Sequence, residues 1–201
     1  MFERYAIYYT FDGLAGKLGA CWLGWDIASG RGAEQPAVEG VDMTQATSRP
    51  RPYGFHATIK APFYLAQGRS EAELKADFGA LCKQSPEVQC GHLSLSRIGR
   101  FLALTVEDDR YVSALACQAV RALDVYRAPL CAEDLARRAK ARLSEQQRAH
   151  LLQWGYPYVM DDFQFHVTLT GSLNDAKIEQ VTAAGMLHFA PLLADPFNIT
   201  H

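Results

Sequence analysis

The sequence predicts an α+β fold in a single domain, 1–201, built from two lobes. Short β-branched and aromatic runs alternate with patterns of helical period, and two of the expected strands form a hairpin, which is typical of α+β proteins. One motif occurs twice, around His56 and again around His166, so each lobe is expected to hold one copy. A chain of 201 residues is long enough for two small lobes that share one core.

The first part of the chain is expected to begin with a strand over Arg4–Tyr9, which is rich in tyrosine. A glycine-punctuated segment follows, with a short helix over Leu14–Leu23. Pro36–Pro52 contains three prolines and few apolar residues, which predicts a loop. A further strand is expected within Tyr53–Tyr64.

The segment Ser70–Gln84 is predicted to form a helix, because Ser70 and Glu73 have the spacing of a capping box and apolar residues follow at helical period. Two β-rich runs come next, Val88–Ile98 and Phe101–Val106. Only two residues separate these runs, so we expect an antiparallel hairpin.

The last part of the chain repeats the mixture of helices and strands. Helices are expected over Asp108–Tyr126, over Ala132–Trp154 as one helix or two, and over Asn174–Leu193. Between them, Tyr158–Gly171 is expected to contain a strand.

Composition excludes several classes of protein. Apolar residues make up 49% and charged residues 21%, so the chain has the apolar surface that a disordered protein lacks. The net charge is −2, which gives no bulk attraction to a nucleic acid backbone.

No apolar run approaches the ~20 residues that cross a bilayer, and the charged, tyrosine-rich start does not resemble a signal peptide. The five cysteines include no C-x-x-C pair. We therefore expect a cytoplasmic protein without a membrane partner.

The repeated motif is the most informative feature of the sequence. The first copy is Phe55-His56-Ala57-Thr58-Ile59-Lys60, and the second is Phe165-His166-Val167-Thr168-Leu169-Thr170. With six histidines in the chain, a threonine two residues after a histidine would occur by chance well under once. The recurrence indicates an internal duplication.

Strand alternation predicts how these side chains are oriented. Successive side chains point to opposite faces, so His56, Thr58 and Lys60 should share one face, and so should His166 and Thr168. If the two strands meet, two imidazoles, two hydroxyls and one ammonium line a polar cleft.

This set of groups suits phosphodiester chemistry without a metal. One imidazole can take a proton from water while the other protonates a leaving alkoxide, and hydroxyl and ammonium groups stabilise phosphoryl oxygens. Two alternatives compete with it. A histidine on a half-buried strand can be purely structural, and a zinc site would need three or four ligands, for which only Asp161 and Asp162 lie close to His166 in sequence. We expect no metal and no cofactor.

The paired motifs resemble those of the 2H phosphoesterase superfamily, His56-Ala57-Thr58-Ile59 and His166-Val167-Thr168-Leu169. Longer strings resemble one bacterial branch of that superfamily, whose members are encoded with phosphonate-degradation genes: Arg4–Tyr8, Tyr53–Phe63, Arg121–Leu130, Trp154–Tyr158 and Phe165–Gly171.

The resemblance implies two antiparallel sheets that face each other across a central cleft, with helices outside and a pseudo-twofold relation between lobes. It implies that His56 and His166 are the acid–base pair and that Thr58 and Thr168 hold the phosphate. The implied substrate is a cyclic ribose phosphate formed in phosphonate catabolism. The branch continues past Phe197–His201 with further strand-forming sequence, so the resemblance also implies an open edge in the second lobe.

Five further residues are candidates for substrate binding. Lys60 either contacts phosphate or is a solvated lysine, and Arg51 either reaches a second phosphate or caps a loop. Tyr53, Tyr156 and Tyr158 either stack on a base or sugar or belong to the core.

Three functions stay open from the sequence. The leading one is hydrolysis of a small cyclic phosphate or nucleotide. The others are processing of short RNA ends, by opening 2′,3′-cyclic phosphates or acting on 2′–5′ bonds, and non-catalytic binding of nucleotides or phosphates.

Overall fold

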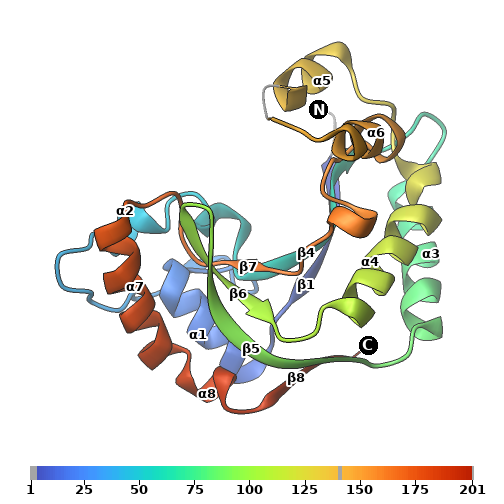
Figure 1. The fold of residues 1–201 in the computed structure, drawn as a ribbon. Coiled ribbons are helices and arrows are strands. Elements are labelled where there is room, and N and C mark those ends of the chain that lie inside the picture. Colours follow the sequence, from blue (N-terminus) through green and yellow to red (C-terminus); the bar gives the residue numbers. More distant parts are fainter. Residues whose placement is uncertain (1–3, 140–141, 201) are drawn as a thin grey trace.

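The computed structural model describes residues 4–139 and 142–200. Its centre is a curled sheet of six strands in the order β1-β4-β7-β6-β5-β8, with every neighbouring pair antiparallel (Figure 1). The strands are β1 (Arg4–Thr10), β4 (His56–Tyr64), β5 (Val88–Ile98), β6 (Phe101–Val106), β7 (Val167–Thr168) and β8 (Pro196–Ile199). A second, small sheet pairs β2 (Trp25–Asp26) with β3 (Arg31–Gly32).

The helices surround the sheet in three groups (Figure 1). On one side lie α1 (Gly13–Leu23), α2 (Met43–Ala46), α7 (Asp175–His188) and α8 (Ala190–Leu193); on the other lie α3 (Glu71–Gln84) and α4 (Arg110–Ala122). The pair α5 (Ala132–Ala139) and α6 (Glu145–Trp154) forms the third group. Short 3₁₀ turns are η1 (Arg51–Tyr53), η2 (Asp124–Tyr126) and η3 (Met160–Asp162). None of the helices over 4–139 and 142–200 has the length and apolarity to cross a membrane.

Most predicted elements are confirmed. The hairpin has the expected strand bounds, and the helix α3 begins with the predicted capping box, in which Ser70 and Glu73 bond each other's backbone. Ala132–Trp154 forms two helices rather than one. The prediction of a loop over Pro36–Pro52 is wrong at Met43–Ala46, which forms the short helix α2, and the short strands β2, β3 and β8, of two, two and four residues, were not predicted. Strands this short carry almost no periodic signal and form because a partner strand is available.

The α+β class is confirmed, but the structure differs from the prediction of two facing sheets. Both motif strands lie in one sheet, and β4 pairs directly with β7 through Ala57 and Val167. A strand of two residues such as β7 can satisfy its backbone only by pairing on both sides, with β4 and with β6. The two copies of the motif are therefore neighbours in one sheet, not members of two separate sheets.

The two faces of the sheet differ in chemistry along one cross-strand row. Leu95, Leu104, Val167 and Ala57 follow each other across β5, β6, β7 and β4. Val167, Leu104 and Ala57 are fully buried, and α7 packs against β5 and β6. This apolar row faces the core, so the residues before and after each member point to the opposite face.

Both phenylalanines that precede the motif histidines are anchored in the same core. Phe55 and Phe165 are buried, and both join a chain of ring contacts that includes Phe197 and Phe189. Each buried Phe side chain stabilises the fold by about 1.5–3 kcal/mol. Because Phe55 and Phe165 point inward, the histidine after each points outward.

Gly19 of α1 makes room for Phe55, because a Cβ at Gly19 would lie 2.0 Å from Cγ of Phe55. We expect Gly19→Ala to lower the free energy of unfolding by about 1–3 kcal/mol, because neither the buried side chain of Phe55 nor the helix α1 can move freely. Gly79→Ala is the matched control: it lies in α3 with nothing within 4 Å of its Cβ, so the change should be neutral or stabilising. Urea denaturation of both variants checks this, and equal effects would contradict the packing argument.

Candidate active site

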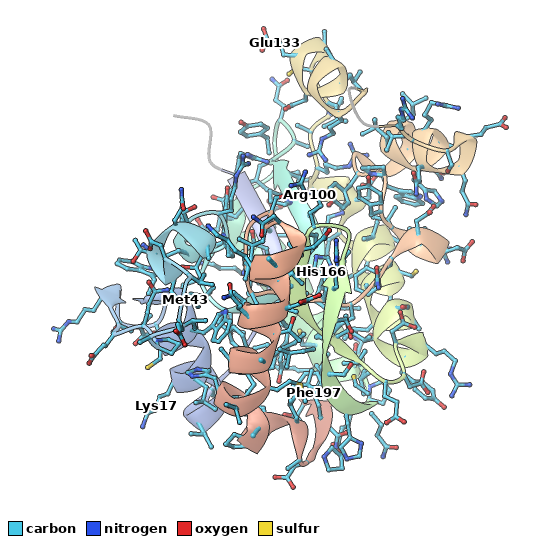
Figure 2. All side chains as sticks on the ribbon, turned by 60° about the vertical axis from the view of Figure 1, so that its left-hand side comes forward. Lys17, Met43, Arg100, Glu133, His166 and Phe197 are labelled. Carbon is cyan, nitrogen blue, oxygen red and sulfur yellow. The ribbon has the colours of Figure 1, made fainter. Side chains whose placement is uncertain are left out.

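The four motif side chains form a two-by-two array on one face of the sheet. Ala57 pairs with Val167 on the core face, so His56 and Thr58 on β4 and His166 and Thr168 beside them point to the other face. In this antiparallel register Thr168 lies opposite His56 and His166 lies opposite Thr58. The imidazoles are diagonal neighbours, whose Cα atoms are typically about 7–8 Å apart. Figure 2 shows His166 near the centre of the molecule.

Both imidazoles are tethered in the same way. Nδ1 of His56 lies 2.9 Å from the carbonyl oxygen of Gly54, and Nδ1 of His166 lies 2.9 Å from the carbonyl oxygen of Gln164. A carbonyl oxygen only accepts hydrogen bonds, so Nδ1 carries the proton in each ring. Nε2 is then the atom that gains or loses a proton, as an acid–base catalyst requires.

His56 is the imidazole whose protonation is perturbed. Burial lowers its pKa below the ordinary value, and the charge of His166 acts in the same direction, while the hydrogen bond to the Gly54 carbonyl opposes them. His56 is therefore neutral at pH 7, in the form that can accept a proton.

The sequence analysis missed Tyr8, which stacks on His56. Their ring centroids are 3.9 Å apart at an angle of 32°, and Tyr8 pairs with Thr58 across β1 and β4, so it lies on the same face. Burial raises the pKa of the Tyr8 hydroxyl, with a smaller contribution from Tyr53 and an opposing one from Arg4. No motif marked Tyr8, because only the strand order shows that β1 borders β4.

A cavity of about 470 Å³ opens beside this array. His166 and Thr58 belong to its wall, and so do two of the three predicted tyrosines, Tyr156 and Tyr158, whereas His56 and Thr168 do not. The rest of the wall is mainly apolar, and includes Ile98, Phe101, Val159 and Phe163. The cavity therefore extends from the imidazole pair on the side of His166.

Tyr53 lies near His56 and outside the wall of this cavity. It is exposed, and its ring centroid is 6.5 Å from that of His56. The three predicted tyrosines thus divide between the two imidazoles: Tyr53 lies near His56, and Tyr156 and Tyr158 share a cavity wall with His166.

Lys60 does not continue the row of His56 and Thr58, contrary to the prediction. Tyr8 pairs with Thr58 but Ile7 pairs with Lys60, so β4 contains one extra residue at this point. Such a β-bulge reverses the alternation, and Ala61 rather than Lys60 lines the cavity with Thr58. Lys60 is buried instead, and its Nζ donates to the carbonyl of Val120 at 3.1 Å.

Arg51 is engaged away from the imidazoles. Its guanidinium donates to the carbonyl oxygens of Leu23 and Thr44 and to the hydroxyl of Thr47, each at 2.8 Å. These bonds fix the segment before β4 to the end of α1, which fits the predicted loop-capping role.

Further hydroxyl groups extend the polar face across the hairpin. Ser96 pairs with Ala103, which in turn pairs with Thr168, so Ser96 lies in the same row as the motif threonine. The hydroxyl of Thr105 lies 2.7 Å from that of Ser96 and 3.2 Å from that of Ser94. The face that carries the imidazoles is therefore polar over several strands.

A carboxylate at the cavity wall is held by α6. Oδ1 of Asp162 accepts from the side-chain amide of Gln147 at 2.9 Å, and Oδ2 lies 3.2 Å from Nδ1 of His150. These contacts bind η3, which helps to form the cavity wall, to α6.

Comparison with known protein families gives a match that covers residues 58–201 and is described as "Protein of unknown function (DUF1045)". The chain belongs to the DUF1045 family. Two curated relatives are named "Ribose 1,5-bisphosphate phosphokinase PhnN", from Janthinobacterium sp. (strain Marseille) and Laribacter hongkongensis (strain HLHK9). They are 35% and 34% identical over 95% and 96% of this chain.

The match covers 44% and 46% of these two relatives, so the chain spans less than half of their length. No solved structure matches the chain.

The stacking of Tyr8 on His56 yields a test. We expect Tyr8→Leu to raise the pKa of His56 toward the ordinary value, because removal of the ring lets water reach the imidazole. Tyr8→Phe keeps the stack and should leave the pKa low. NMR titration of the histidine ring protons measures both, with the exposed Tyr111→Leu as control. A pKa that does not change in Tyr8→Leu would show that the ring does not shield His56.

Proposed function

We propose that this protein is a metal-independent phosphodiesterase of the 2H type, which hydrolyses a cyclic ribose phosphate in phosphonate catabolism. The observation that carries the proposal is the pair of imidazoles on one face of the sheet. Each is held through Nδ1 by the carbonyl two residues earlier, and each keeps Nε2 for proton transfer.

The proposed reaction opens the phosphate ring with water. Nε2 of neutral His56 takes a proton from water, whose oxygen forms a bond to phosphorus. The bond from phosphorus to the ester oxygen on the opposite side breaks, and Nε2–H of protonated His166 supplies the proton to the leaving alkoxide. The product is a ribose phosphomonoester, and the two imidazoles have exchanged protonation states.

The threonine hydroxyls take the second role. Thr58 and Thr168 alternate with the imidazoles in the array, so a phosphorus centre between the rings would lie within reach of both hydroxyls. Hydroxyl donors aimed at the non-bridging oxygens stabilise the charge that develops as water attacks. They add no charge of their own that could shift the imidazole pKa values.

The names of the relatives support a ribose phosphate as the substrate class. Opening a cyclic phosphate on ribose gives a ribose phosphomonoester, and the relatives are named for a kinase that acts on a ribose bisphosphate. This chain corresponds to less than half of those proteins, and its sequence contains no G-x-x-x-x-G-K-[ST] phosphate-binding loop. Our proposal therefore assigns the hydrolytic step, rather than phosphoryl transfer from a nucleotide, to these residues.

Substitution of either imidazole tests the proposal. We expect His56→Ala and His166→Ala each to lower kcat on a cyclic ribose phosphate by about 100- to 10,000-fold, because each removes one proton-transfer partner. His188→Ala is the control, since that ring bonds the Leu18 carbonyl between α1 and α7. Activity should persist in EDTA. Full activity in either motif variant would refute the mechanism, and loss of activity in EDTA would indicate a metallohydrolase.

The pH dependence follows from the lowered pKa of His56. A base works when neutral, so on the acid side the rate should fall as the pH drops through the pKa of His56, and this acid limb of kcat/KM should have its midpoint below the ordinary histidine value of about 6.5. Tyr8→Leu should move this limb to higher pH. Ligand binding that does not depend on pH and leads to no turnover would support a non-catalytic binding protein instead. Turnover of RNA ends, without turnover of the small cyclic phosphate, would support RNA end processing.

A further inference from the structure

A narrow pocket next to the active-site cavity concentrates positive charge. Four basic side chains line it, and the lining includes one carboxylate, that of Asp134. Its volume is about 20 Å³, which admits single oxygen atoms of a ligand but not a sugar ring. The basic residues are Arg4, Lys60, Arg127 and Arg138.

The pocket and the cavity share a wall. Ala61, Tyr156 and Val159 line both, so a ligand in the cavity can reach the pocket mouth. Along β4, Thr58 lines the cavity, Lys60 lines the pocket, and Ala61 lines both, so the two spaces meet just past the bulge.

Arg4 connects the pocket to the imidazoles by a second route. It lines the pocket, and its charge lowers the pKa of Tyr8, which stacks on His56. Its guanidinium lies 5.5 Å from the ring centroid of Tyr64. The strand β1 therefore runs from the basic pocket, at Arg4, to the imidazole pair, at Tyr8.

Lys60 is the most constrained of the four cations. Its side chain is 3% exposed, and Nζ donates to the Val120 carbonyl at 3.1 Å and lies 3.8 Å from Asp124. Burial lowers its pKa to about 8, and the charge of Arg127 contributes in the same direction. An ammonium has three donors, and of these two contacts only that with the Val120 carbonyl is within hydrogen-bond distance.

The Lys60 ammonium shares its acidic partner, Asp124, with Arg127. The guanidinium of Arg127 bonds the same carboxylate of Asp124 through two nitrogens, at 2.7 and 3.1 Å. Two cations thus depend on one carboxylate, which leaves positive potential at the pocket. An anionic ligand there would stabilise both.

We propose that the mouth of this pocket binds a second phosphate group, one oxygen of which enters the pocket, so that the substrate is a cyclic ribose phosphate which carries a further phosphate at C5. This inference rests on the proposed function of the imidazole pair. In this arrangement the cyclic phosphate lies between the imidazoles, the sugar occupies the cavity, and oxygens of the second phosphate contact Lys60 and Arg4. Ring opening then gives a ribose bisphosphate, the class of compound for which the relatives are named.

The test compares matched ligands. Ribose 1,2-cyclic phosphate is assayed with and without a 5-phosphate, and ribose 5-phosphate and ribose are titrated calorimetrically. We expect kcat/KM for the 5-phosphorylated substrate to be about 10- to 100-fold higher, as one or two charged hydrogen bonds would give. The ratio should fall toward one in Lys60→Met and Arg4→Ala. Arg110→Ala, which removes an exposed cation outside both pockets, should keep the ratio.

The outcomes separate the two proposals. Equal kcat/KM for both substrates in the wild type, or a ratio unchanged in both Lys60→Met and Arg4→Ala, overturns the second phosphate site and leaves the hydrolase intact. If neither cyclic compound is turned over, the hydrolase proposal fails, and the calorimetric titration alone decides the site. Binding of ribose 5-phosphate that is tighter than binding of ribose, and lost in Arg4→Ala, then supports it. Arg4 is exposed, so this variant gives a result even if Lys60→Met unfolds.

Discussion

The pairing of Ala57 with Val167 is the contact on which the candidate site depends. The side-chain period of a strand is two, so a slip of one residue between β4 and β7 would turn the imidazole and hydroxyl of one strand into the core and Ala57 or Val167 outward. Both apolar residues are fully buried, and this burial opposes the slip. The same register places each histidine opposite the threonine of the other copy, which is why two short, identical patterns produce one compact array.

The surrounding helices hold this register in place. The indole nitrogen of Trp22, at the end of α1, donates to the carbonyl of Leu169 at 3.0 Å, immediately after β7. Trp22 is fully buried and packs on Phe189, whose ring stacks with that of Phe55. One helix therefore contacts the residues that flank both motif strands. A polar face that must keep two imidazoles oriented is supported by an apolar face with little freedom to rearrange.

The sequence allowed prediction of the features that depend on local pattern. The hairpin, the capping box of α3 and the shared face of His56 and Thr58 all follow from periodicity over a few residues. Features that depend on which strands become neighbours were not predictable. The single sheet, the stacking of Tyr8 on His56 and the bulge that removes Lys60 from the polar row all arise from pairing between distant segments. The roles of the candidate residues stay predictions, and the structure adds where each side chain lies.

The two imidazoles are held in the same way but have different surroundings. This difference bears on which imidazole acts as the base and which as the acid. Both imidazoles have the same tether, but His56 lies under Tyr8, while His166 faces the cavity and lies 6.1 Å from Phe101, measured between ring centroids. The bulk of a substrate fits only where there is room, on the side of His166. The leaving oxygen of a cyclic phosphate belongs to the sugar, so it would lie next to His166, and an in-line attack must come from the opposite side, next to His56. In the proposed mechanism, the space in the cavity and the lowered pKa of His56 therefore favour the same roles by separate arguments: His56 as base and His166 as acid.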